Sequence, residues 1–364
     1  MGRSQDIRPR HRRCRRPARR HGAGHYPLRQ PRSARLISNP PRTPIMGKTR
    51  AYGADCALLA AFEASYGVLP ADGYTRLSFK ESSLGAERPL GYDPLLGQGR
   101  DAQDPFYEAI KDEGDVGVPL DVRALGFWLK GLFGAPATAD NGDTTFNHVF
   151  TSGGTLPSLA IEIGHAQLAA PKFFRHGGAK LDKLSFDMAR SGAANASIGV
   201  IAQGETEAAT TIDATPATFA LKRFSQGSGT IRVGGGQLAN VVGGKLSFSN
   251  NLERVETIRA DGLIDGVDET EATAEGSVDI RFGTDTTLTT AIAAESPVAM
   301  EYGFTIPGSA FALTFHLPRV FLPKKKQEIK GPGGIQASYD WRAARDPVAG
   351  YLLRVTLVND VAGY

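Results

Sequence analysis

Histidine and cysteine, the residues that most often bind metals or act as nucleophiles and bases, are few in this chain and scattered along it. The two cysteines are Cys14 and Cys56, and the seven histidines are His11, His21, His25, His148, His165, His176 and His316. No histidine forms an i, i+4 pair with a helical Glu, and none joins a cysteine at zinc-binding spacing. We therefore predict no disulfide framework, no metal site and no cofactor. His148 and His316 lie in strand-like runs, where the simplest interpretation is a partly exposed strand histidine.

Acidic side chains gather in one segment, which is the strongest candidate for carboxylate chemistry. Its carboxylates, which alternate with Gly262 and Gly266, are Asp261, Asp265, Asp268, Glu269 and Glu271. Their order lacks the Asp-x-Asp-x-Asp-Gly pattern of a calcium loop, and nothing indicates the carboxylate pair of a glycosidase. The chain also lacks the G-x-S-x-G, P-loop and dinucleotide-binding motifs. We interpret the segment as a solvated acidic hairpin or loop and predict that the chain is not an enzyme.

A short basic run, Lys324, Lys325 and Lys326, follows Pro323. The simplest interpretation is a solvated turn. The alternative is that these lysines pair with acidic loops of a neighbouring subunit.

Charge is unevenly divided along the chain. The whole sequence carries a formal +4, but residues 1–45 hold 13 Arg, no Lys and a single acidic residue, Asp6. Residues 46–364 therefore keep 29 basic and 37 acidic residues, which leaves an acidic body of −8. The first 45 residues also hold seven Pro and almost no apolar periodicity, so we predict that they are disordered. Such a leader is either a basic arm for nucleic acid or the translation of GC-rich upstream DNA before a start at Met46. We favour the second interpretation.

The elements that must position these residues differ between the two ends of the body. Asp55 to Tyr66 is predicted as a short helix, and 68–118 as a long polar stretch with one strand near Leu77. Asp121 to Phe133 is the best helix, capped by Asp121 and stopped by Gly134. Its apolar surface is wider than one stripe, so we expect it beneath a sheet or at a subunit contact.

From Thr144 onward the pattern is one of short strands. Leu159, Ile161 and Ile163 alternate with smaller or polar residues. Further strands are predicted near residues 181–189, 195–203, 216–224, 229–234, 244–249, 274–282, 297–304, 309–317, 319–322, 334–342 and 350–358. No apolar run approaches the roughly 18 residues needed to span a bilayer, so no membrane is expected.

The tetrapeptide Lys-Leu-Ser-Phe occurs at Lys183–Phe186 and again at Lys245–Phe248. A second strand-like run follows each copy, at Ala196–Val200 and at Gly276–Ile280. The offset between copies is 62 residues for the first strand and 80 for the second, so the later copy carries an 18-residue insertion that includes the acidic segment. The repeated order of strand, connection and strand indicates a duplicated β unit, and such units stack or close around an axis.

The order of segments resembles the tail tube (major tail) proteins of long-tailed bacteriophages and prophages. The resemblance covers about Gly47 to Tyr364 and excludes the Arg-rich leader. The segments that carry it are Leu125–Gly134, Leu156–Gly164, Phe248–Glu253, Leu313–Val320 and Tyr351–Asp360.

The resemblance implies a mainly β fold, a tail-tube-type sandwich or barrel, here duplicated, with one or two flanking helices and long inter-subunit loops. It also implies rings that stack into a tube in the virion, after assembly in the host cytoplasm. A chain with two tube units implies a trimeric ring, and a chain with one implies a hexameric ring; we favour the trimer. Twenty-four strands, about 4.8 Å apart and tilted roughly 40°, enclose a backbone diameter of about 48 Å, enough for a DNA duplex. An acidic lining would repel that duplex and let it slide.

The expected domains are a leader at 1–45, a helix and extended arm at 46–120, a first β unit at 121–226 and a second at 227–364. The expected partners are further copies of the chain, the tape measure, tail terminator and distal tail proteins, and double-stranded DNA that passes without sequence-specific binding. The candidate inter-subunit contacts are Leu77, Phe79, Leu84, Leu95, Trp128, Asp261, Asp265, Asp268, Lys324, Lys325 and Lys326. The rival interpretation is a carbohydrate- or receptor-binding β-sandwich, which would expose an aromatic cluster.

Overall fold

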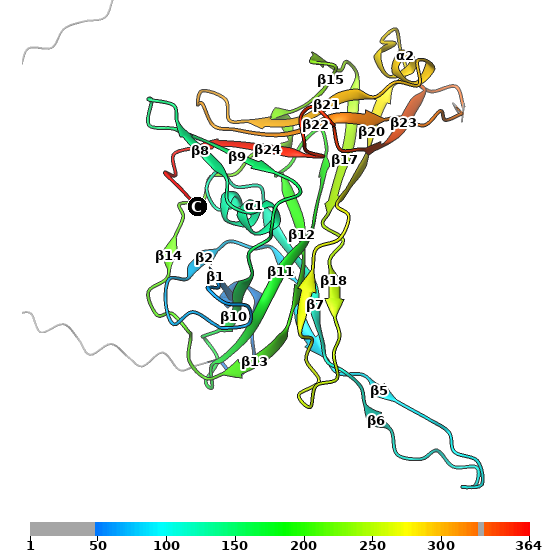
Figure 1. The fold of residues 1–364 in the computed structure, drawn as a ribbon. Coiled ribbons are helices and arrows are strands. Elements are labelled where there is room, and N and C mark those ends of the chain that lie inside the picture. The colour runs from blue at the N-terminus through cyan, green and yellow to red at the C-terminus, as the bar shows by residue number, and fades with distance from the viewer. Residues whose placement is uncertain (1–47, 327–330) are drawn as a thin grey trace, which may run out of the picture. The chain divides into compact units, whose positions relative to one another are not determined.

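A single long strand organises the fold of this chain. The computed structural model describes residues 48–326 and 331–364, which belong to one compact unit, Met46–Tyr364; the expected leader lies outside them. Strand β11 (Lys172–Met188) has 17 residues. Its first part pairs with β10 (Leu159–His165) and β13 (Gly204–Ala208), and its second part pairs with β12 (Asn195–Ala202) and β17 (Val241–Ser249). One strand therefore belongs to two sheets, and the prediction of a mainly β fold is confirmed (Figure 1).

The second part of β11 lies at the centre of an antiparallel sheet that we call the central sheet. Each neighbouring pair of strands in it is antiparallel. From one edge to the other, its strands are β3 (Glu81–Ser82) together with β4 (Gly85–Glu87), β7 (Lys111–Pro119), β12, β11, β17, β20 (Thr273–Arg281) and β23 (Gln336–Ala343). The short strands β3 and β4 pair one after the other with the same edge of β7, so they count as one position and the sheet is seven strands wide.

Two further layers cover the inner face of the central sheet. The first consists of β14 (Ala217–Thr218), β2 (Thr75–Leu77), β1 (Ala57–Phe62), β10, the start of β11, and β13. The second consists of β16 (Gly236–Gln237), β15 (Gly229–Val233), β21 (Val298–Thr305), β22 (Ala312–Phe321), β24 (Arg354–Asn359), β9 (Phe146–Thr151) and β8 (Ala137–Asp140). One hydrophobic core runs through all three layers, so burial of apolar surface holds them together.

Helix α1 (Leu125–Phe133) lies within this core. All of its residues except Lys130 are buried, as the two-sided apolar surface predicted. Gly134, at φ 85°, ends it in a backbone conformation that favours glycine. Asp121 caps the turn before the helix, because its Oδ1 accepts hydrogen bonds from the amides of Arg123 and Ala124. A second helix, α2 (Thr287–Ala293), and two 3-10 turns, η1 (Gly53–Asp55) and η2 (Gln226–Ser228), were not predicted.

The predicted helix at Asp55–Tyr66 is wrong, because this segment forms β1. Leu58 packs into the main core on one face, while Leu59 packs into a small cluster with Tyr74 on the other. A strand that is buried on both faces has a continuous apolar run, which periodicity alone does not separate from a short buried helix.

The polar stretch at 68–118 is more ordered than its composition indicates. It contains β2, β3, β4 and the nine-residue β7, which pairs with β12 from Asp112 to Pro119. The true arm is confined to 88–110 and holds the hairpin β5 (Leu90–Gly91) and β6 (Phe106–Tyr107). The strand predicted at 216–224 shrinks to β14, and the acidic segment forms the predicted hairpin, β18 (Glu253–Val255) and β19 (Gly266–Asp268).

The expected boundary at residue 226 does not follow the layers. Strands β8 and β9 precede it in sequence, yet β9 pairs along its whole length with β24 at the end of the chain. The layers therefore combine strands from both sides of residue 226 around the core described above.

Candidate functional site: a polar sheet face, its two edges and a projecting arm

The two copies of Lys-Leu-Ser-Phe lie side by side at the middle of the central sheet. They pair antiparallel in β11 and β17, and Ser185 lies directly opposite Ser247. These two serines are equivalent under the offset of 62 residues. The outer strands differ in register, because Ser185 lies opposite Ser197 whereas Ser247 lies opposite Glu275, two residues before Ser277. Leu184 and Phe248 on one side of this pair are fully buried, while Lys183 and Lys245 point to solvent. The repeat is therefore a structural element, with an apolar inner face and a polar outer face.

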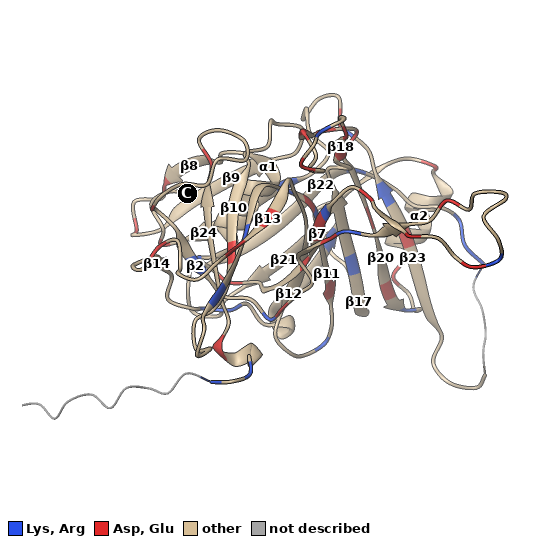
Figure 2. Cartoon of the chain, turned by 90° about the horizontal axis from the view of Figure 1, so that it is seen from below, with Lys and Arg blue, Asp and Glu red and all other residues tan. Residues whose placement is uncertain are grey.

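The outer face of the central sheet is polar from edge to edge. Its middle carries small residues, including Ser185, Ser197, Gly199, Ser247 and Ser277. Charged residues flank them, and Figure 2 shows blue and red segments alternating on these strands. The charged positions are Glu113, Asp115, Lys183, Asp187, Lys245, Glu275, Asp279, Arg281, Asp340 and Arg342. Carboxylates outnumber cations among these positions by six to four, and by eight to five when Lys111, Glu81 and Glu87 of the same face are included. The aromatic residues of the central sheet, Phe186, Phe248, Tyr339 and Trp341, are buried on its other face.

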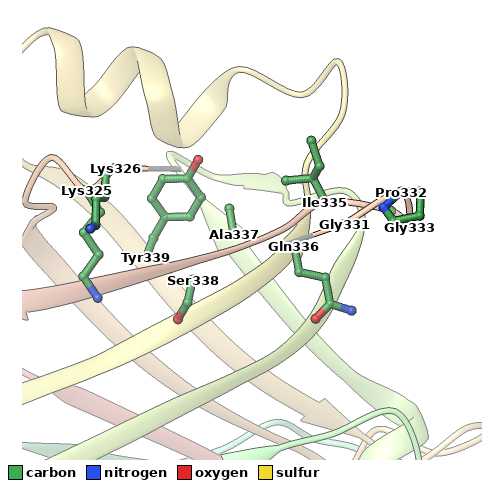
Figure 3. A pocket seen from close by; sticks show the side chains of 11 residues that line it. Lys325, Lys326, Gly331, Pro332, Gly333, Ile335, Gln336, Ala337, Ser338 and Tyr339 are labelled. Carbon is green, nitrogen blue, oxygen red and sulfur yellow. The ribbon is translucent and has the colours of Figure 1, made fainter. Parts of the chain in front are cut away.

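One edge of the central sheet is β23. It pairs with β20 over its length, but with β22 only at Arg342 and Ala343. Among the described residues, Gln336–Trp341 has no strand on its other side. A cavity of about 840 Å³ opens there. In Figure 3, Ile335 and Tyr339 point toward the helix drawn above the strand, and Ser338 points away from it.

The other edge is formed by β3 and β4 beside β7. These strands hold two and three residues, and no further strand pairs with them in the described ranges. The sheet alternates in direction across seven strands, so this edge and β23 run the same way. Unpaired edges of this kind are sites where another chain adds a strand.

The arm at 88–110 projects from the body at the end far from α2 (Figure 1). It exposes several large apolar side chains, and Leu96 is 99% exposed. The others are Leu90, Tyr92, Leu95, Phe106 and Tyr107, each more than half exposed. A concentration of apolar side chains on one projecting segment is typical of a contact surface.

The acidic hairpin β18–β19 packs against its own chain, at the root of the arm. The carbonyl of Gly262 accepts a hydrogen bond from the amide of Ile110 at 3.0 Å, and Arg254 forms an ion pair with Glu113. Lys180 Nζ lies 2.7 Å from Glu269 Oε1. The acidic hairpin therefore supports the root of the arm.

A comparison with models of known protein families gives a match for this chain. The family described as phage tail tube protein matches residues 53–343, which is most of the chain. The chain belongs to the phage tail tube protein family. A search of curated proteins gives no match. As a tail tube protein it has a structural role in the virion tail, as the resemblance of its segments implied.

The tail tube protein buries three of its predicted contact residues. Leu77 is 3% exposed, Leu84 9% and Trp128 1%, because all three pack into the core of their own chain. Their side chains are not on the subunit surface, so the prediction that they contact a neighbour gives way to a packing role. Phe79 is partly buried against the same core, whereas Leu95 is 60% exposed on the arm.

The charged candidates of the tail tube protein lie on its surface, and several already have partners. Arg259 contacts both Asp261 and Asp265, and this guanidinium lowers the pKa of Asp261 to about 2. Lys325 pairs with Asp340 of β23. The remaining candidates, Asp268, Lys324 and Lys326, are exposed.

Two strand histidines differ from each other. His316 is partly exposed, as predicted, but the prediction for His148 is wrong, because its side chain is completely buried. His148 Nδ1 lies 2.9 Å from Thr138 Oγ1, and Nε2 donates to the carbonyl of Val361 at 2.9 Å. Burial lowers its pKa from the ordinary 6.5. In this tail tube protein it is a packed and hydrogen-bonded core residue.

Sequence reasoning missed the arm tip and the open edge at β23. Leu96, Tyr92 and Tyr107 were not singled out, although large apolar residues among Pro and Gly were a usable signal. The open edge had no signal, because a strand's neighbours depend on the whole fold. No helix among the described residues is long and apolar enough to cross a membrane.

Proposed function

We propose that copies of this protein close into rings by joining the β23 edge of one chain to the β3/β4 edge of the next. Rings then stack into a tube, with the central sheet facing the lumen, and genomic DNA passes through it during ejection. The observation that carries this proposal is one wide sheet with a polar outer face and an open edge on each side. Joining the edges satisfies backbone groups that would otherwise attract uncontrolled pairing.

The width of the central sheet favours three chains in a ring. Three chains supply 21 strands, which at about 4.8 Å spacing and roughly 40° tilt enclose a backbone diameter of about 42 Å. Inward side chains leave about 30 Å, which admits a DNA duplex. Six chains would enclose about 84 Å on the same basis, far wider than a duplex needs. Because the two edges run in the same direction, the joint between chains is parallel.

The chemistry of the outer face suits a conduit. Carboxylates outnumber cations on it, so a duplex with one negative charge per about 1.7 Å of axis is repelled overall. Serine and glycine at the centre leave a smooth surface. The aromatic residues of the central sheet are buried on its other face, so this face offers none of the stacking contacts that hold single strands. DNA therefore passes without sequence-specific binding.

The arm is proposed to contact the next ring or a neighbouring subunit. Its exposed apolar side chains lose contact with water on docking, which supplies the driving force for stacking. The tape measure, tail terminator and distal tail proteins are the other proposed partners, met during assembly in the host cytoplasm.

An arm replacement tests this function. Glu87 lies directly opposite Lys111, so residues 88–110 can be replaced by a two-residue Asn-Gly turn without disturbing the central sheet. We expect a folded protein that no longer forms tubes in negative-stain electron microscopy, whereas the unchanged protein forms stacked rings.

The matched control keeps the arm and changes only its tip, as Leu95→Ser with Leu96→Ser. We expect this variant to keep its thermal stability and to form fewer and shorter tubes. Normal tubes from the Asn-Gly variant would refute the role of the arm, and compact particles from the unchanged protein under all conditions would count against the whole proposal.

A further inference from the structure

Three side chains from different strands meet at the root of the arm. Asp112 of β7 and His176 of β11 are buried, and Glu205 of β13 is partly buried. Each has a carboxylate oxygen or ring nitrogen within 4.8 Å of the corresponding atoms of the other two. Since Zn²⁺ lies about 2.0–2.2 Å from such ligands, two ligands of one tetrahedral ion lie about 3.4 Å apart. The three groups therefore need only a small adjustment to share an ion.

The two ring nitrogens of the buried histidine, His176, have different surroundings. His176 Nδ1 lies 2.9 Å from Asp112 Oδ2 and 3.0 Å from Asp112 Oδ1. His176 Nε2 has no hydrogen-bond partner, although the side chain is only 1% exposed. The two ring nitrogens face opposite ways, so the nitrogen that lies beside Asp112 and can bind an ion together with it is Nδ1. Its separation from the carboxylate is close to that between two ligands of one tetrahedral ion.

The cluster is accessible to an ion from one side. His176 and Glu205 line a cavity of about 560 Å³, whose wall also includes Phe79, Ile163 and Phe174. The surrounding apolar side chains strengthen any electrostatic attraction between the carboxylates and a cation.

We propose that Asp112, His176 and Glu205 bind a divalent first-row transition metal ion, with Zn²⁺ as the probe. One imidazole with two carboxylates suits such ions, whereas Mg²⁺ and Ca²⁺ prefer oxygen ligands alone. The site holds three protein ligands and leaves room for water in a further position.

The bound ion fastens the arm to the body. Asp112 lies directly opposite Ala86, two residues before Arg88 at the start of the arm. The amide of Ala86 donates to Glu205 Oε2 at 3.2 Å. An ion bound by Asp112 and Glu205 therefore links β7 of the central sheet to β13 of the first covering layer. Through the pairing of Asp112 with Ala86 and the hydrogen bond from Ala86 to Glu205, both strands are also linked to β4. This inference stands apart from ring formation, because it concerns a single chain.

The test measures Zn²⁺ binding to the full chain by calorimetry and elemental analysis. We expect one ion per chain, and X-ray absorption at the zinc edge should show nitrogen and oxygen neighbours without sulfur. Glu205→Gln keeps an acceptor for Ala86 but loses the charge, and should weaken binding at least tenfold. Chelation should also speed hydrogen exchange in residues 85–87 and 111–113.

Two matched controls make the result decisive. Glu207→Gln changes the same residue type on the same strand, where Glu207 pairs with Lys172. Cys56→Ser changes a thiol in the same cavity, where Cys56 Sγ lies 3.2 Å from His165 Nδ1. Both variants should bind Zn²⁺ like the unchanged protein. Absence of binding, equal binding by Glu205→Gln, or a loss confined to Cys56→Ser would each overturn the proposal.

Discussion

Each half of the central sheet contains a similar pair of antiparallel strands, but the segments attached to the two pairs differ. β11 with β12 forms the first half, and β17 with β20 forms the second. The first half is bordered by β7, the short edge strands and the arm, whereas the second is bordered by β23 and carries the acidic hairpin. The two similar strand pairs form the scaffold. The arm, the acidic hairpin and the two edges, which occur in one half only, supply the proposed surfaces for assembly.

The two halves also contact each other through segments outside their central strands. The hairpin inserted into the second half hydrogen-bonds to Ile110, at the root of the arm of the first. In the other direction, Asn250 of the second half donates to the carbonyls of Leu132 and Leu181. A duplicated unit that retained two independent cores would not need these contacts.

The largest expected effect comes from adding a side chain at Gly276 in the second half. Gly276 lies opposite Leu246, where the first half has Ile198 opposite Leu184. A Cβ at Gly276 would lie 2.0 Å from the Lys245 carbonyl oxygen and 2.5 Å from Trp341 Cζ2. Gly276→Ala should therefore lower the free energy of unfolding by about 3 kcal/mol or more. Urea unfolding measures it.

A change of the same size in the β12 strand of the first half is the control for this comparison. Ala196→Gly removes a buried methyl group from a strand and should cost only about 1 kcal/mol. Equal losses from the two variants would mean that the halves tolerate the same residues, and the proposed divergence around Trp341 would be wrong.

A smaller effect distinguishes two buried histidines of the layers that cover the central sheet, His148 of β9 and His176 of β11. The ring nitrogens of His148 are hydrogen-bonded, whereas Nε2 of His176 is not. Burial lowers the pKa of His148 in the folded state below the ordinary 6.5, so the unfolded chain binds the proton more readily. Stability is therefore lost as the pH falls below about 6.5 toward the folded-state pKa.

His148→Gln should reduce this acid-dependent loss. Part of the slope remains, because burial also lowers the pKa of His316. Thermal unfolding of both proteins between pH 8 and pH 5 measures the difference. Parallel curves over this range would show that His148 does not titrate with unfolding.

The sequence predicted the strands near the end of the chain well and those around the arm poorly. Strands β20, β21 and β24 have alternating buried and exposed residues, so their period was visible. β1 is buried on both faces, and β7 begins with the polar run Lys111–Asp115, so neither showed a strand period. Pairing between the repeats, by contrast, follows from contacts distant in sequence that no local pattern specifies.

The candidate contact surfaces, like the strands, were predicted only in part. The acidic hairpin and the exposed Leu95 were anticipated, because charge and isolated apolar residues in a polar stretch are local signals. Leu77 and Trp128 were assigned to contacts although they are core residues, since burial within a chain and burial between chains favour the same residue types. The cluster of Asp112, His176 and Glu205 was missed, because the three positions are separated widely in sequence.

Disulfide cross-linking between the two edges tests the central claim most directly. In a protein with Cys14 and Cys56 changed to Ser, Glu81→Cys is combined in turn with Gln336→Cys, Ser338→Cys and Asp340→Cys, so that several registers are sampled. Paired strands bring Cα atoms within the roughly 4.4–6.8 Å that a disulfide requires. We expect at least one combination to give a reducible ladder of covalent oligomers that ends at three chains in assembled tubes. Monomers in all three combinations, or a ladder that continues to six, would contradict the trimeric ring joined at β23 and β3/β4.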